Sequence, residues 1–241
     1  MRALLLPSPL EGEGGGASPP GEGNGSQNIP SPASLCSAAL SLKGRGQIHV
    51  LFALEREAAP FRRRARDLEH ISIHVSGVGR QRARAATEQL LREPPSPRLV
   101  IAAGFCGAIS PTLKVGDIVT SPRIVTVDHL VGDSAEKRQL AELHHADAVD
   151  MESAAVAEVC AAKGVAFRAV RAVSDTVDTA LSPELIRLLA GGRVSVWKAV
   201  GALARKPALL GEFRRLARDT RLAARNLAEA LRTMLADPGV L

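Results

Sequence analysis

The sequence is poor in aromatic residues and cysteines, and it has no long apolar run. Tyrosine is absent, and one Trp and five Phe are the only other aromatic residues among 241, so Ala, Val, Leu and Ile must build the core. Cys36, Cys106 and Cys160 form no CxxC or Cys/His pattern. The adjacent His144 and His145 cannot share a helix face, so we predict no metal site. No apolar run reaches the ~18 residues of a membrane span, and we expect a cytoplasmic protein.

The net charge of +6 comes entirely from the C-terminal part of the chain. From Arg193 to the end there are ten Lys and Arg and four Asp and Glu, a balance of +6. Because the basic charge is confined to one element and few aromatic residues lie among its arginines, we predict no nucleic-acid binding.

An amphipathic helix is predicted in the same basic part. Its apolar stripe, interrupted by one threonine, has spacings of three and four and comprises Phe213, Leu216, Thr220, Ala223, Leu227, Leu231 and Met234. Two interpretations stay open. The stripe packs on the domain or on the partner subunit of an expected homodimer, or the helix lies on an anionic membrane as a peripheral contact.

The composition divides the chain into three parts. Residues 1–46 hold nine of the 21 Gly and six of the 15 Pro without an apolar period, which predicts a disordered low-complexity segment; translation from a wrongly assigned start would explain it equally well. Residues 47–185 carry the folded domain, and residues 186–241 form the basic helical tail.

Within 47–185, apolar runs of strand length alternate with helical patterns. Runs at 48–54, 98–109 and 165–175 are mostly apolar, 71–79 is predicted as a strand that ends in two glycines, and 113–127 adds one or two more strands. We therefore predict an α/β fold whose central sheet is mostly parallel and flanked by helices, with a C-terminal helical extension. Ser134 is expected to cap one helix, and a second is expected to begin at Asp150 and to stop at Gly164.

Several candidate site residues follow the ends of these strands. They are Glu57, the glycine turns at Gly77 and Gly79 and at Gly104 and Gly107, and Asp175, while Glu152 opens a helix. Because ligands bind at the carboxyl ends of parallel strands, we expect these groups at one rim. Carboxylates there suit a leaving group that needs a proton and a developing cation that needs negative charge, as in cleavage of an N-glycosidic bond. Helix capping remains the alternative for each acid.

Three motifs resemble one known family. "PTLKVGDIV" (111–119), "AVDMESAAVAEVC" (148–160) and "FRAVRAVSDTVD" (167–178) are similar to the purine nucleoside phosphorylase and methylthioadenosine/S-adenosylhomocysteine nucleosidase superfamily. Within it, "SAEKRQL" and the tail "ALSPELIRLL…GALARKPALLGEFRRLARD" most resemble the hopanoid-associated phosphorylases. That resemblance implies release of adenine from adenosylhopane, a lipid-linked nucleoside, in hopanoid biosynthesis.

The resemblance also implies roles for individual residues. Glu152 matches the glutamate that binds the ribose hydroxyls, and Met151 the methionine packed on the sugar. Asp175, beside Ser174, matches the aspartate that protonates purine N7. Glu57 occupies the place of the acid that positions the attacking water in the hydrolases. The resemblance implies no cofactor beyond inorganic phosphate as a potential co-substrate.

The sequence departs from the family pattern at two places. Phe105 stands where many members carry a Ser near the nucleophile or phosphate, which makes phosphorolysis less certain than hydrolysis. A strand-and-helix unit that normally helps to bind the purine is missing around Ser121 to Val125. Two alternatives to the hopanoid substrate therefore remain: cleavage of methylthioadenosine or S-adenosylhomocysteine, and a non-catalytic nucleoside-binding homologue.

Overall fold

A computed structural model describes residues 46–92, 94–182, 184, 186 and 209–236 of the chain. The segment 1–45, which the sequence predicts to be disordered, lies outside the described residues. Residues 187–208 of the predicted basic tail also lie outside the described residues.

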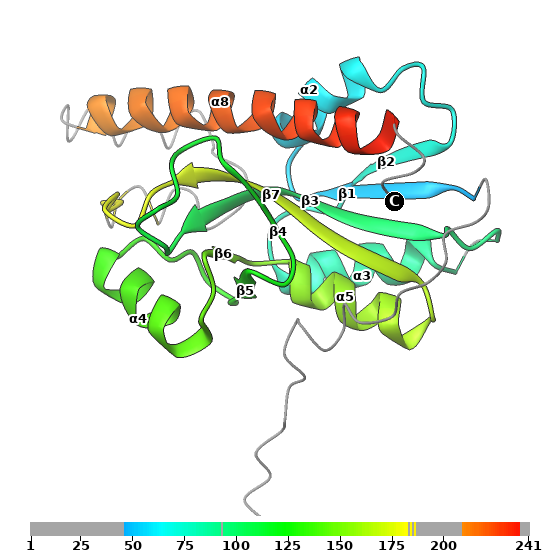
Figure 1. Cartoon of the computed structure of the whole chain (residues 1–241), viewed down its shortest axis with the longest axis horizontal. Coiled ribbons are helices and arrows are strands. Elements are labelled where there is room, and N and C mark those ends of the chain that lie inside the picture. Colours follow the sequence, from blue (N-terminus) through cyan, green and yellow to red (C-terminus); the bar gives the residue numbers. More distant parts are fainter. Residues whose placement is uncertain (1–45, 93, 183, 185, 187–208, 237–241) are drawn as a thin grey trace, which may run out of the picture.

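A seven-stranded mixed sheet forms the centre of the fold (Figure 1). Its strands are β1 (Ile48–Phe52), β2 (Ile71–Val75), β3 (Leu99–Ala108), β4 (Ile118–Thr120), β5 (Ile124–Thr126), β6 (Ala148–Asp150) and β7 (Ala166–Asp175). The pairs β1–β2, β1–β3, β3–β7 and β5–β6 are parallel, and β3–β6 and β4–β7 are antiparallel. The predicted mostly parallel sheet is confirmed.

Helices cover both faces of this sheet, as Figure 1 shows. On one side lie α2 (Glu55–Arg64) and α8 (Leu209–Ala236), and on the other α3 (Arg80–Leu90) and α5 (Ser153–Ala162), while α4 (Ser134–His144) lies beside the short strands. Two buried clusters fill the layers, one between the sheet and α2 and α8, the other between the sheet and α3 and α5. Apolar strands buried on both faces are the cause of this layering.

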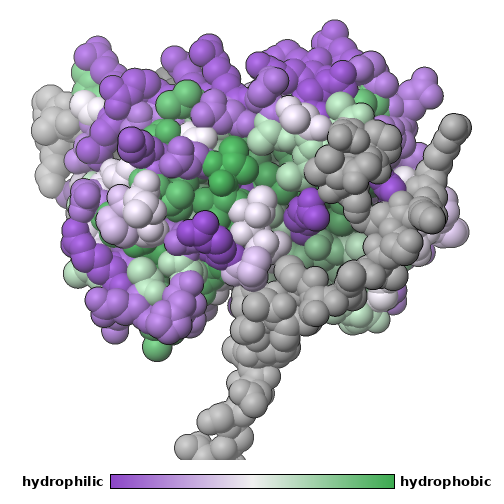
Figure 2. All heavy atoms as spheres, in the orientation of Figure 1, coloured by the Kyte–Doolittle hydropathy of each residue, from purple (hydrophilic) through white to green (hydrophobic). Residues whose placement is uncertain are grey.

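The tail helix is part of the core. Its predicted stripe faces inward, because Ala223, Leu227 and Leu231 are completely buried against α2 and the sheet. Arginines such as Arg214, Arg218 and Arg225 lie on the exposed face, and polar residues crowd the edge that α8 forms in Figure 2. The stripe therefore packs on the domain, as the first of the two interpretations predicted. A buried stripe cannot enter a bilayer.

Two local expectations need correction. Asp133, not Ser134, is the N-cap of α4, and its carboxylate accepts a hydrogen bond from the N–H of Ala135 at 2.7 Å. The expected helix from Asp150 begins only at Ser153, because Ala148–Asp150 forms β6. Among the described residues, no helix combines the length and apolar character that crossing a membrane requires.

Candidate active site

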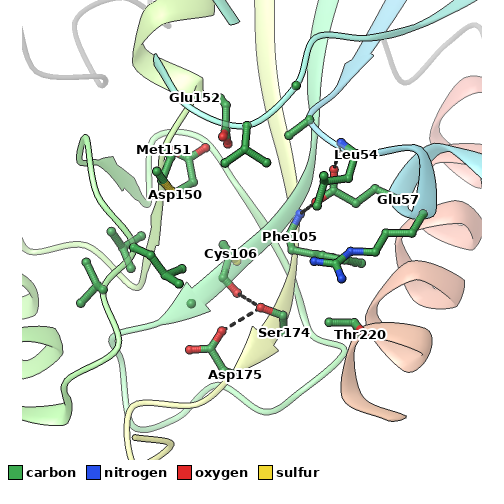
Figure 3. A pocket seen from close by; sticks show the side chains of 18 of the residues that line it. Leu54, Glu57, Phe105, Cys106, Asp150, Met151, Glu152, Ser174, Asp175 and Thr220 are labelled. Carbon is green, nitrogen blue, oxygen red and sulfur yellow. Dashed lines mark hydrogen bonds between the residues drawn. The ribbon is translucent and has the colours of Figure 1, made fainter. Parts of the chain in front are cut away.

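A cavity of about 870 Å³ opens where the carboxyl ends of β1, β2, β3 and β7 meet. Its wall includes eight of the ten predicted site residues: Glu57, Gly77, Phe105, Gly107, Met151, Glu152, Ser174 and Asp175. Figure 3 shows Glu57, Glu152 and Asp175 around this space, each on a different element. Gly79 and Gly104 do not line the cavity but contact residues that do.

Glu57 is a buried carboxylate in the first turn of α2, 3% exposed. It accepts hydrogen bonds from the N–H of Leu54 at 2.8 Å and of Phe105 at 3.1 Å, so it caps the helix and also faces the cavity (Figure 3). Burial raises its pKa to about 7, against the opposing effect of the Arg171 guanidinium. A carboxylate with a pKa near neutrality is suited to accept a proton from water.

Glu152 ends the turn between β6 and α5. Its Oε1 accepts a hydrogen bond from the N–H of Gly79 at 2.8 Å, and its Oε2 lies 3.6 Å from the Arg171 guanidinium. Burial raises the pKa of Glu152, and Arg171 opposes the shift. The Gly79 contact is possible because Gly77 and Gly79 adopt φ values of +89° and +100°, which turn backbone amides toward the site.

Arg171 links the acids beneath the cavity. It is 1% exposed, and one of its guanidinium nitrogens lies 2.6 Å from Oδ2 of Asp150. The carboxylate of Asp150 in turn accepts a hydrogen bond from the N–H of Ser153 at 3.2 Å. The N-cap residue of α5 is Glu152, whose side chain makes no capping hydrogen bond. A buried cation beside Glu57, Asp150 and Glu152 offsets part of the cost of burying three carboxylates.

Asp175 ends β7 on the opposite side of the cavity. Its Oδ1 lies 2.7 Å from the hydroxyl of Ser174, which also lies 3.1 Å from the carbonyl oxygen of Cys106 (Figure 3). Its Oδ2 accepts a hydrogen bond from the ammonium of Lys137 at 2.5 Å. Gly107 leaves space for this carboxylate, since a Cβ there would lie 3.2 Å from Oδ2.

Sequence reasoning missed several residues of the site. It did not single out Arg171 and Lys137, which are buried cations next to the cavity. It also did not place His129, Leu216 and Thr220 in the cavity wall, which they line. Hydrogen bonds to Glu136 and Asp128 raise the pKa of His129. A signal existed for Arg171, because an arginine inside an apolar strand is expensive to bury without a partner. Within the described segments, no cluster of three or more His, Cys, Asp or Glu residues is placed to hold a metal ion.

Gly104 offers a test of how tightly the buried charges are packed. A Cβ at this position would lie 2.6 Å from the Arg171 guanidinium and about 3.2 Å from Glu57, so we expect Gly104→Ala to lower the free energy of unfolding by about 1–3 kcal/mol, measured by denaturant unfolding. The control Gly211→Ala lies on α8 with no atom within 4 Å of its added Cβ, and helix propensity predicts equal or higher stability. Equal stability of Gly104→Ala and the parent would contradict the close packing.

Comparison with known proteins identifies the family. A family model described as the Phosphorylase superfamily matches residues 56–125 and 122–190, more than half of the chain. The chain belongs to the Phosphorylase superfamily. The two matched segments meet at residues 122–125, where the sequence predicts a missing unit and where only three residues join β4 to β5.

Similar proteins and structures agree with this assignment. A 5'-methylthioadenosine/S-adenosylhomocysteine nucleosidase of Staphylococcus epidermidis is 26% identical over 196 residues, which cover 53% of this chain and 86% of that protein. Two solved Helicobacter pylori structures share the fold at 16% identity. The 5'-methylthioadenosine/S-adenosyl homocysteine nucleosidase has a TM-score of 0.58, with coverage of 80% of this chain and 99% of that chain. Futalosine hydrolase has a TM-score of 0.59, with 80% and 98% covered.

Proposed function

We propose that the protein cleaves the N-glycosidic bond of an adenine nucleoside. The observation that carries the proposal is the arrangement of Glu57, Glu152 and Asp175 around one cavity at the carboxyl ends of the strands. The nucleosidase relatives support the same reaction class. Loss of a purine from ribose creates an oxocarbenium-like transition state, which nearby carboxylates stabilise.

Each acid has a separate task in this proposal. Asp175, held by Ser174, donates a proton to the purine N7 as the bond to the sugar breaks. Glu152 accepts hydrogen bonds from the ribose hydroxyls, while Met151 packs on the sugar. Glu57, whose pKa of about 7 leaves a large fraction ionised at neutral pH, takes a proton from the attacking nucleophile.

Water is the nucleophile that this site favours. Glu57 is an acceptor for the proton of water, and Phe105, which by the resemblance stands near the nucleophile, offers phosphate no side-chain hydrogen bond. Phosphate, the potential co-substrate, would meet the carboxylates of Glu57 and Glu152. It would also meet the guanidinium groups of Arg56 and Arg82 in the same cavity wall. The preference for water therefore rests on Glu57 and Phe105.

The substrate of the proposal is adenosylhopane. The resemblance of the "SAEKRQL" and tail segments supports it, and apolar side chains of the cavity wall offer contacts to a hydrocarbon substituent: Val75, Val78, Leu130, Val131, Leu181 and Leu216. Methylthioadenosine and S-adenosylhomocysteine are the alternative substrates that the Staphylococcus epidermidis relative favours. A cytoplasmic homodimer completes the proposal. Because the apolar stripe of α8 is buried, contact with the inner membrane face would be electrostatic only, through exposed arginines of α8.

Adenine release is the direct test. The full chain is incubated separately with adenosylhopane, methylthioadenosine and S-adenosylhomocysteine, each with and without phosphate, and free adenine is measured. We expect release from adenosylhopane at the same rate in both buffers, because water attacks. A requirement for phosphate would identify a phosphorylase instead, and release only from the soluble nucleosides would reject the hopanoid substrate.

The same substrates separate an enzyme from a binding protein. Calorimetric titration measures the affinity for each nucleoside independently of turnover. Affinity without adenine release from any of the three would establish a non-catalytic homologue. This outcome is the one expected if the missing unit near Ser121 to Val125 is indispensable for catalysis.

A further inference from the structure

Lys137 is a completely buried cation beside the proposed acid. It lies on α4, its side chain is 0% exposed, and its ammonium donates hydrogen bonds to Oδ2 of Asp175 at 2.5 Å, to the carbonyl oxygen of Thr176 at 2.8 Å and to that of Thr179 at 3.2 Å. The three N–H donors of a lysine are therefore all used. Their geometry fixes the ammonium against the carboxylate.

The geometry points to Lys137 as a positioning residue for the leaving-group chemistry of Asp175. This inference rests on the proposed function, in which Asp175 protonates the departing base. Asp175 takes up a proton from solvent before the step. As the bond from sugar carbon to base nitrogen breaks, its electron pair goes to the base, and that proton passes from Asp175 to N7. Asp175 is left as a carboxylate, and the fixed ammonium of Lys137 stabilises that charge as it forms.

Two features distinguish this arrangement from an ordinary structural ion pair. A buried ammonium is costly unless it is fully paired, and here its carboxylate partner is the one that lines the cavity. The connection of α4 to the loop after β7 has a second, exposed link, from Arg138 to Asp178 at 2.7 Å. The cavity-lining Asp175 thus receives the buried cation, and the surface Asp178 receives the exposed one.

The test compares two leaving groups on one variant. Adenine needs a proton to depart, whereas p-nitrophenolate, released from p-nitrophenyl β-ribofuranoside, departs without one. We expect Lys137→Met to lower kcat for adenine release from the best nucleoside substrate by about 100-fold, with KM changed by less than about threefold. For p-nitrophenolate release we expect a change in kcat of less than about threefold.

The control is Arg138→Met, which removes the exposed link between the same helix and the same loop. We expect its kcat to stay within about twofold of the parent on both substrates, consistent with a surface ion pair. Equal losses on both leaving groups in Lys137→Met, or no loss of adenine release, would overturn the positioning role. A parent protein that releases no adenine would instead reject the proposed function itself.

A second variant covers the case in which Lys137→Met does not fold, as circular dichroism would show. Lys137→Gln retains an N–H donor for Asp175 but removes the charge. We expect it to lose adenine release selectively, with kcat reduced by more than about tenfold while KM is retained. Full adenine release by Lys137→Gln would show that the charge does not act on Asp175 and would contradict the inference.

Discussion

Glu57→Gln is expected to lower the kcat of adenine release by about 10³-fold, within the range found when a general base is removed. The glutamine keeps the size of the side chain and an oxygen for the N–H of Leu54 or Phe105, but it cannot take a proton from water. The measurement is steady-state adenine release, accompanied by thermal unfolding to establish that the fold is retained.

The pH profile gives an independent measure of the same group. Glu57 acts as a base only when ionised, and burial raises its pKa from 4.5 to about 7. The value of kcat/KM should therefore decline tenfold per pH unit below about 7, rather than below 4.5. A profile that is flat between pH 5 and pH 7 would contradict the assignment of Glu57 as the base.

Glu88→Gln serves as the control for this variant. Glu88 lies on the exposed face of α3, at 4.0 Å from Arg84, and does not line the cavity. Its replacement is expected to change kcat by less than about twofold, as for other surface ion pairs. A comparable loss in both variants would indicate a general effect of removing negative charge, not a base at position 57.

The site residues at the carboxyl ends of the long strands were predictable, because parallel strands bring those ends to the same edge of the sheet. The apolar run that ends in Ser174 and Asp175 forms β7 to its last residue. The expected glycine turn at Gly104 and Gly107 is wrong, because both residues lie within β3, which continues beyond them. In parallel strands the carboxyl ends meet at one rim. Residues far apart in sequence, such as Glu57 and Asp175, therefore come to one cavity without any pairwise signal between them.

The charged support beneath the site was not predictable in the same way. Arg168 and Arg171 both interrupt the apolar strand β7, and their spacing of three places them on opposite faces of the sheet. Which face receives the acids depends on the position of β6 and α5, and β6 has only three residues, too few for a periodicity. Lys137 likewise resembles a solvent-exposed helix residue until α4 is placed beside Asp175.

The short connection between β4 and β5 lies where the sequence departs from the family pattern. Strands Ile118–Thr120 and Ile124–Thr126 were expected as one or two strands, and they pair with different neighbours, β7 and β6. The alignment with the nucleosidase relative extends over 196 residues but covers only 53% of this 241-residue chain. Part of the aligned region of that relative therefore has no counterpart in this chain. The cavity wall is instead completed by His129 and its neighbours and by Leu216 and Thr220 of α8.

Glu152→Gln is expected to lower kcat by about 10³-fold while the fold is retained. In the proposed reaction, hydrogen bonds to the ribose hydroxyls strengthen in the transition state and contribute several kcal/mol, and the carboxylate charge favours the oxocarbenium ion. Burial raises the pKa of Glu152, which means that burying its charged carboxylate costs free energy on folding. The neutral amide of glutamine avoids that cost, so the fold should be retained. Adenine release and thermal unfolding are measured side by side.

The comparison of activity with stability decides between catalysis and capping at position 152. Glu158→Gln is the matched control, because Glu158 lies on α5, the helix that Glu152 precedes, and is paired with Arg80 at 2.6 Å outside the cavity. We expect Glu152→Gln to shift Tm by less than about 4 °C, roughly 1 kcal/mol for a chain of this size, and Glu158→Gln to keep full activity. A large fall in Tm with little loss of turnover would assign Glu152 a structural role alone, through the hydrogen bond that it accepts from the N–H of Gly79, the N-cap of α3.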